Sequence, residues 1–88
     1  MKFELGNVDI TRGCLEFLNS KDITPLPYYR RHASGDWGKL SEDDKPVNHQ
    51  ALIDGGGLVG SYEVVGEKIY VVTEWDRSVT TMLLADEY

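Results

Sequence analysis

The sequence predicts an α+β fold in which about three short helices precede a three-stranded antiparallel meander and pack on one face of it. Two patterns carry this prediction. Apolar residues recur at helical spacing over the first 55 positions, whereas the chain from Leu58 onward is rich in Val, Ile, Tyr, Thr and Trp. Because 88 residues are enough for one domain and too few for two, we expect a single domain over 1–88, helical at about 9–55 and extended at about 58–85.

The first two predicted helices start at threonine residues. Thr11 can accept a hydrogen bond from a first-turn N–H group, which makes it a suitable N-cap for a helix over about 12–19. The apolar stripe of that helix includes Cys14. Thr24-Pro25 provides a second start signal. Proline suits the first helical position, because the N–H group that it lacks would have no intrahelical partner there. We expect the second helix to stop at Gly35.

The third predicted helix covers roughly 44–54. Ser41 and Asp44 have the spacing of a capping box, but a cap at Ser41 would put Pro46 past the first turn, where it removes a helix hydrogen bond. We therefore favour Asp44 as the cap. The run of glycines at 55–57 ends the helix.

Three strands are expected at 58–65, 68–75 and 79–84. Gly66-Glu67 separates the first two strands at hairpin distance, and residues 76–78 separate the second pair. This order of elements predicts the antiparallel meander.

The charge balance disfavours several classes of partner. The formal net charge is −6, and residues 36–88 alone carry −7, from four basic and eleven acidic side chains. Such a surface repels DNA, RNA and anionic membranes over most of its area. No apolar run is long enough to cross a bilayer, and the first residues lack the apolar stretch of a signal peptide. A lone cysteine forms no internal disulfide, so we expect a soluble cytoplasmic protein.

No motif indicates a metal or a cofactor. Gly55–Gly60 satisfies G-x-G-x-x-G, but the nucleotide motif needs a strand before it and a helix after it, and here the order is reversed. The spacings among Cys14, His32 and His49 match no metal-ligand pattern. We expect Cys14 to be a small core residue and His32 to be a partly exposed helix residue.

Two segments concentrate chemically active side chains. Residues 30–38 place arginines, a histidine, an aspartate and a tryptophan around a helix end, and residues 73–81 place Glu74 and Asp76 beside a turn. Helix-end charge pairing and turn hydrogen bonds explain both segments, and we favour this structural interpretation over a functional one.

Several separated motifs resemble those of a family of small uncharacterised proteins encoded on bacterial plasmids, genomic islands and phages, often labelled only "plasmid-related". The resemblance covers about residues 11–88, and Pro46 departs from the family's usual start of the third helix. It implies a mobile-element setting and supplies no catalytic residue. The motifs that carry it are Arg31-His32, Gly35-Asp36-Trp37-Gly38, Glu42-Asp43-Asp44, Asn48, Ser61-Tyr62, Thr73-Glu74, Asp76-Arg77-Ser78, Thr80-Thr81 and Glu87-Tyr88.

The favoured hypothesis is a non-catalytic protein-interaction module without a cofactor or metal. An acidic inhibitor of a host defence or nucleic-acid-binding protein, of anti-CRISPR or anti-restriction type, would occupy a basic groove of a host or element-encoded protein. A homodimer through an edge of the sheet, at the third strand, is a further expectation. The candidate binding residues are Asp36, Trp37, Glu42, Asp43, Asp44, Tyr62, Glu63, Glu74, Asp76 and Arg77, with Trp37 or Tyr62 as aromatic anchors.

Two alternatives remain open at this point. The first is a small enzyme or toxin, such as a nuclease, that uses Arg31, His32, Asp36 and the Glu74-Asp76-Arg77 turn, which requires these groups to meet in one cleft. The second is a nucleic-acid-binding accessory protein that uses the basic residues Arg12, Lys21, Arg30 and Arg31.

Overall fold

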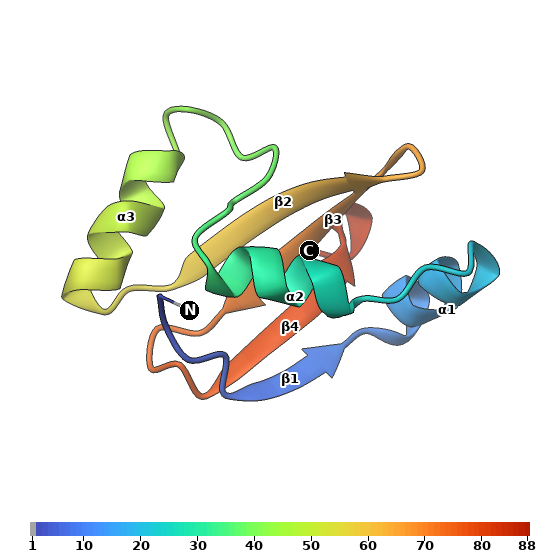
Figure 1. Cartoon of the computed structure of the whole chain (residues 1–88), viewed down its shortest axis with the longest axis horizontal. Helices are drawn as coiled ribbons and strands as arrows, with labels where there is room; N and C mark the ends of the chain where they lie inside the picture. The colour runs from blue at the N-terminus through green and yellow to red at the C-terminus, as the bar shows by residue number, and fades with distance from the viewer. Residues whose placement is uncertain (1) are drawn as a thin grey trace.

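A computed structural model describes residues 2–88, which form a four-stranded mixed sheet, three α-helices and one 3₁₀ turn (Figure 1). The strand order is β1-β4-β3-β2. The elements along the chain are β1 (Asn7–Ile10), α1 (Arg12–Ser20), α2 (Leu26–Ala33), α3 (Lys45–Asp54), β2 (Leu58–Val64), β3 (Glu67–Thr73), β4 (Val79–Leu84) and η1 (Ala85–Glu87).

The predicted three-stranded antiparallel meander is wrong, because β1 adds a fourth strand that pairs in parallel with β4. The strands β2, β3 and β4 do form antiparallel pairs in sequence order. β1 has only four residues, and its partner lies some 70 positions further along the chain. Local patterns carry no information about such a pairing.

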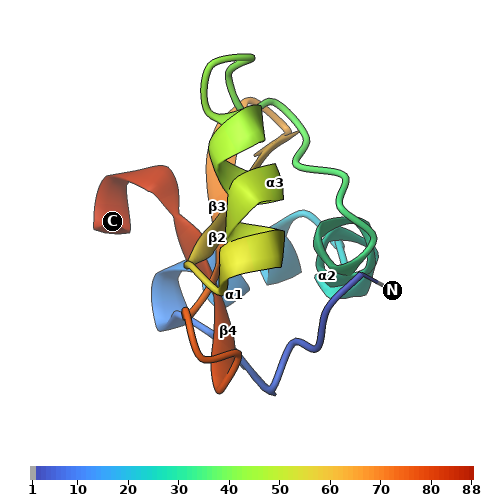
Figure 2. The ribbon, with the colours of Figure 1, turned by 90° about the vertical axis from the view of Figure 1, so that its left-hand side faces the viewer.

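The helices also do not share one face of the sheet. Figure 2, in which the sheet is seen edge-on, places α2 on one side of it and η1 on the other. The buried residues Cys14 and Leu18 of α1 join the core on the α2 side. α3 contacts β2 at the outer edge of the sheet.

The expected side-chain cap is confirmed for α1 alone. α2 begins at Leu26, one residue later than expected, and the Asp44 side chain precedes α3 without accepting a capping hydrogen bond. Thr11 Oγ1 accepts a hydrogen bond from Cys14 N at 3.2 Å, and α1 follows at once. α3 begins directly after Asp44, while Ser41 Oγ accepts from Asp44 N at 3.2 Å and closes the preceding turn. Gly55 ends α3 in the left-handed region, with φ of 87°, which glycine adopts without a steric penalty.

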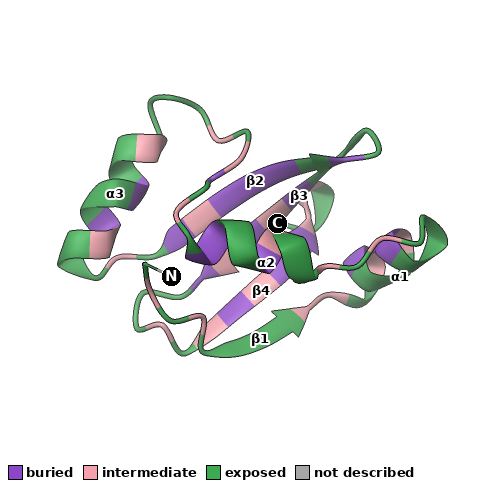
Figure 3. Cartoon of the chain, in the orientation of Figure 1, coloured by how far each residue is buried: buried purple, intermediate pink, exposed green. Residues whose placement is uncertain are grey.

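The register gives the sheet two distinct faces. The helix face, under α2, comprises Leu58, Gly60, Tyr62 and Val64 of β2, Ile69, Val71 and Thr73 of β3, and Thr80, Met82 and Leu84 of β4. The open face comprises Val59, Ser61 and Glu63 of β2, Lys68, Tyr70 and Val72 of β3, and Val79, Thr81 and Leu83 of β4. Buried residues concentrate in the three long strands, whereas β1 is mostly exposed (Figure 3).

The turn between β2 and β3 is one residue earlier than expected. Val65 and Gly66 form it, with φ of 49° and 80°, the signature of the tight hairpin turns that favour Asn-Gly. Val65 is a β-branched residue in the left-handed region, which is sterically unfavourable.

Replacing Val65 with asparagine is therefore expected to stabilise the protein. The side chain is exposed, so little packing is lost, and relief of the backbone strain should add about 1 kcal/mol to the free energy of unfolding. Thermal denaturation should show a midpoint about 4–8 °C higher. Gly66→Ala is the matched control and should lower the midpoint, and an unchanged midpoint in Val65→Asn would show that the turn is unstrained.

Candidate functional site

His32 lies at the centre of the core, where its ring joins segments far apart in the sequence. It follows the buried Tyr29 by three positions on the sheet side of α2, and none of its surface is exposed. Its Nε2 lies 2.9 Å from Thr73 Oγ1, which lies 2.7 Å from Thr80 Oγ1. Thr80 Oγ1 donates to the carbonyl of Leu5 at 2.7 Å. The expectation of a partly exposed His32 is wrong, because helical periodicity places it among the core residues of α2.

The direction of this hydrogen-bond chain shows that Nε2 of His32 carries a proton. Since the hydroxyl proton of Thr80 goes to the Leu5 carbonyl, Thr73 must donate to Thr80 and accept from His32 Nε2–H. Within residues 2–88, the buried Nδ1 has no hydrogen-bond partner. Burial, and secondarily the positive charge of Arg77, lowers the pKa of His32 to about 4. The ring is therefore neutral at pH 7, and its hydrogen bonds link α2 to β3 and β4 inside the core.

Asp36 ties the end of α2 to β2. Arg31 Nε donates to Asp36 Oδ2 at 2.8 Å, and Gly38 N donates to Oδ1 at 3.1 Å. The hydrogen bond from Arg31 holds the pKa of the Asp36 carboxyl below its usual value. Tyr62 OH donates to the Asp36 carbonyl at 2.7 Å, and the Arg31 guanidinium lies 4.8 Å from the centre of the Tyr62 ring. The Asp36 carboxylate is thus engaged within its own loop.

The two expected aromatic anchors are inside the protein. Trp37 and Tyr62 are 3% and 1% exposed. The Trp37 ring packs against His32 and Phe3, with centroid distances of 5.4 and 6.2 Å, and joins a core cluster with Leu58. Neither side chain can reach a partner without unfolding of the loop that holds it, so their role is in packing.

Arg77 binds the C-terminal end of α3. Its Nη1 donates to the carbonyls of Gly56, Glu74 and Trp75 at 2.6, 3.2 and 3.2 Å. Its Nη2 donates to the Ala51 carbonyl at 3.1 Å. The guanidinium donates both to carbonyls at and just after the end of α3 and to carbonyls of the β3–β4 turn, so this candidate binding residue is an internal tie between the two segments.

The candidate catalytic groups do not form an open reactive site. The His32 and Arg77 side chains both lie beside Phe3, with ring and guanidinium distances of 5.2 and 5.7 Å, but both are already hydrogen-bonded inside the fold. Asp76 accepts from Ser78 N at 3.0 Å within its own turn. Burial raises the pKa of the Cys14 thiol to about 11, so the expected core role of this residue agrees with the structure.

The chain itself covers much of the sheet edges. Asn48 pairs with the backbone of Val59 at the outer edge of β2: its Nδ2 donates to Val59 O at 2.6 Å, and its Oδ1 accepts from Val59 N at 3.2 Å. Further along β2, Ser61 N donates to the Trp37 carbonyl at 3.0 Å. The third predicted strand, β4, is flanked by β1 and β3, so its edge is not available to a second copy.

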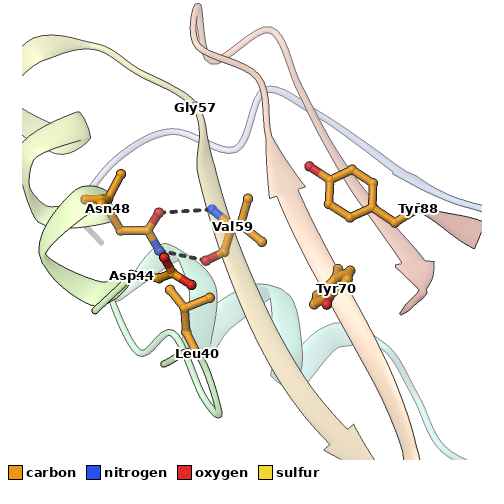
Figure 4. A pocket seen from close by; sticks show the side chains of 8 residues that line it. Leu40, Asp44, Asn48, Gly57, Val59, Tyr70 and Tyr88 are labelled. Atoms are coloured by element: carbon orange, nitrogen blue, oxygen red, sulfur yellow. Dashed lines mark hydrogen bonds between the residues drawn. The ribbon is translucent and has the colours of Figure 1, made fainter. Parts of the chain in front are cut away.

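A cavity of about 300 Å³ lies on the open face between α3 and the C-terminal segment (Figure 4). Asp44 and Asn48 border it from the α3 side, Val59 forms its floor, and Tyr70 and Tyr88 stand opposite, with their ring centres 5.3 Å apart. The remaining lining residues are Leu40, Val47 and Gly57. This volume is at the small end for ligand sites and suits one side chain better than a cofactor.

Five of the acidic candidates remain exposed around this face. Glu63 belongs to the open face of β2, and Glu74 continues the open-face alternation of β3, with its N–H donating to Val79 O. Asp44 lines the cavity. Glu42 and Asp43 lie in the turn immediately before Asp44, and Glu42 accepts from Lys45 Nζ at 2.9 Å.

Comparison with known proteins provides no relative: no protein-family model, curated protein or solved structure matches the chain. Within residues 2–88 no group of three or more His, Cys, Asp or Glu side chains could hold a metal ion. The same part of the chain contains no helix that is both long and apolar enough to cross a membrane.

The residues that sequence reasoning missed are Thr73, Thr80, Tyr70 and Tyr88. Both threonines occur in strand segments at positions whose neighbours two residues away are apolar, such as Val71 and Met82. This alternation marks an inward-facing polar residue that needs an internal partner. The pairing of Tyr70 with Tyr88 had no local signal, because it depends on the chain returning across the sheet after β4.

Proposed function

We propose that this chain is a small non-catalytic interaction module that binds a basic protein through the acidic surroundings of the open face. The observation that supports it most is the difference in exposure among the candidate residues. Trp37 and Tyr62 are buried, and Arg77 donates to backbone carbonyls of the fold. The half-exposed Asp36 carboxylate pairs with Arg31, and the exposed Asp76 accepts within its own turn. The acidic residues Glu42, Asp43, Asp44, Glu63 and Glu74 are exposed.

Charge complementarity supports a basic partner. The net charge of −6 and the acids around the open face favour rapid encounter with a positively charged surface and repel nucleic acid. Two lysines near these acids each lie beside one of them. Lys45 donates to Glu42, and Lys68 stands opposite Glu63 in the strand register. A nucleic-acid-binding groove of another protein has the required charge.

The resemblance to the plasmid-related family extends the proposal to its setting. We infer that the protein acts in a bacterial cytoplasm on behalf of a mobile genetic element. A host defence protein or an element-encoded protein with a basic groove, which the chain would occupy and block, is the proposed partner.

The test compares two variants with the same change in net charge. The open-face variant combines Glu42→Gln, Asp43→Asn, Glu63→Gln and Glu74→Gln. The control variant combines Glu4→Gln, Glu16→Gln, Asp22→Asn and Glu67→Gln, which are exposed acids outside the open face. A partner captured from the bacterial host is purified, and its dissociation constant is measured by calorimetry at several salt concentrations.

We expect the open-face variant to bind at least about tenfold more weakly than the control variant, since each lost charge contact contributes a few tenths of a kcal/mol or more. Affinity of the wild-type chain should fall as salt rises. Equal affinity of the two variants would refute the proposal, and so would binding that does not depend on salt.

A further inference from the structure

The cavity on the open face combines three chemical features. Val47 and Val59 supply aliphatic surface, Tyr70 and Tyr88 supply two aromatic rings, and Asp44 supplies a carboxylate. Asp44 Oδ2 accepts from Ser41 Oγ at 2.9 Å, which holds the carboxylate in place at the start of α3. Val47 and Tyr88 are largely exposed, so the cavity is open to an approaching partner.

These features together match one type of side chain. An aliphatic side chain would contact the valines and tyrosines but offer the exposed Asp44 carboxylate no hydrogen-bond donor, and an acidic side chain would be repelled by it. A guanidinium stacks on aromatic rings and donates hydrogen bonds to a carboxylate, and its alkyl stem packs on aliphatic surface. The more strongly hydrated ammonium of lysine matches the tyrosine pair less well.

We propose that this cavity receives one arginine side chain of the partner protein. The stem lies along Val47 and Val59, and the guanidinium lies against Tyr70 and Tyr88 and faces Asp44. This inference rests on the proposed function, since it identifies the anchoring contact within the acidic surface. The rim acids attract the partner, and the cavity selects the residue that docks.

The experiment uses the complete ¹⁵N-labelled chain and four short peptides. The probe is N-acetyl-Gly-Arg-Gly-amide, and the matched peptides carry citrulline, lysine or norleucine in place of arginine. Citrulline keeps the shape of arginine without its charge. Amide shifts of cavity residues, Gly57 and Tyr70 among them, report binding in two-dimensional NMR spectra.

We expect saturable shifts at the cavity with the arginine peptide, and at least about fivefold weaker binding of each other peptide. Asp44→Asn and Tyr70→Leu should each weaken the arginine peptide about fivefold, with unfolding midpoints measured to verify the fold. Glu67→Gln, which removes an exposed acid outside the open face, is the matched acid control and should leave peptide binding unchanged.

Tighter binding of norleucine or citrulline would overturn the inference in favour of an apolar site, and tighter binding of lysine would overturn the choice of arginine. Absence of saturable shifts at the cavity would also overturn it. The purified partner separates this failure from that of the proposed function. If the open-face variant loses the partner while Asp44→Asn and Tyr70→Leu retain it, the acidic surface functions without an arginine site.

Discussion

Replacing His32 with alanine is expected to lower the free energy of unfolding by about 3 kcal/mol. The substitution empties a fully buried volume and removes the donor to Thr73 in the chain that continues through Thr80 to Leu5. Urea denaturation measures the loss. Thr73→Val should cost about 1–2 kcal/mol, because it leaves the His32 Nε2–H without an acceptor. A loss below about 1 kcal/mol in His32→Ala would show that the ring is not a structural connector.

The same residue should make stability depend on pH. The pKa of His32 is about 4 in the folded chain, below the ordinary value of about 6.5 that applies when it is unfolded. Between these values the unfolded state binds more protons, so stability is complete above about pH 6.5 and declines as the pH falls toward 4. The decline attributable to His32 is about 3 kcal/mol. It should be absent in His32→Gln and retained in His49→Gln, which replaces the exposed histidine.

Arg77→Ala is expected to have the second largest effect, a loss of about 2–3 kcal/mol. One guanidinium satisfies the carbonyls of Ala51, Gly56, Glu74 and Trp75, and hydrogen bonds from a charged donor are stronger than neutral ones. Arg77→Lys should recover only part of the loss, because an ammonium cannot reproduce the planar fork.

The control for this prediction is Arg30→Ala, which removes an exposed arginine of α2 and should change stability by less than about 0.5 kcal/mol. Urea denaturation with a constant slope checks both variants. If Arg77→Ala unfolds at the same urea concentration as Arg30→Ala, the hydrogen bonds of Arg77 do not stabilise the fold. The structural role assigned to Arg77 would then be wrong.

Local chemistry was sufficient to predict most elements of this fold. Thr11 and Gly55 define helix ends through a hydrogen bond and a backbone angle that involve only neighbouring residues. The β-branched and aromatic content after Leu58 predicts strands for the same reason. The interior position of Cys14 follows from its place on an apolar stripe.

The largest error, the missed fourth strand, has a non-local cause. β1 exists because β4 offers it a partner, and Asn7 meets Val79 only in the folded chain. The helical spacing of α2 was a local sign that His32 is buried, but its acceptor Thr73 comes from a strand that follows it by 41 positions. The candidate site also has one part that the sequence predicts and one part that it does not. Exposure of the acids could be expected from their charge, whereas the cavity forms only because Tyr88 meets Tyr70 in the folded chain.

The central claim is that buried residues such as His32 maintain the fold, whereas the exposed acids around the open face bind the partner. The most direct test measures the dissociation constant of the purified partner for two variants, His32→Gln and the open-face variant, at pH 7.5 under conditions where both are folded. We predict wild-type affinity for His32→Gln and at least about tenfold weaker binding for the open-face variant. Loss of binding in His32→Gln with wild-type affinity in the open-face variant would contradict this account.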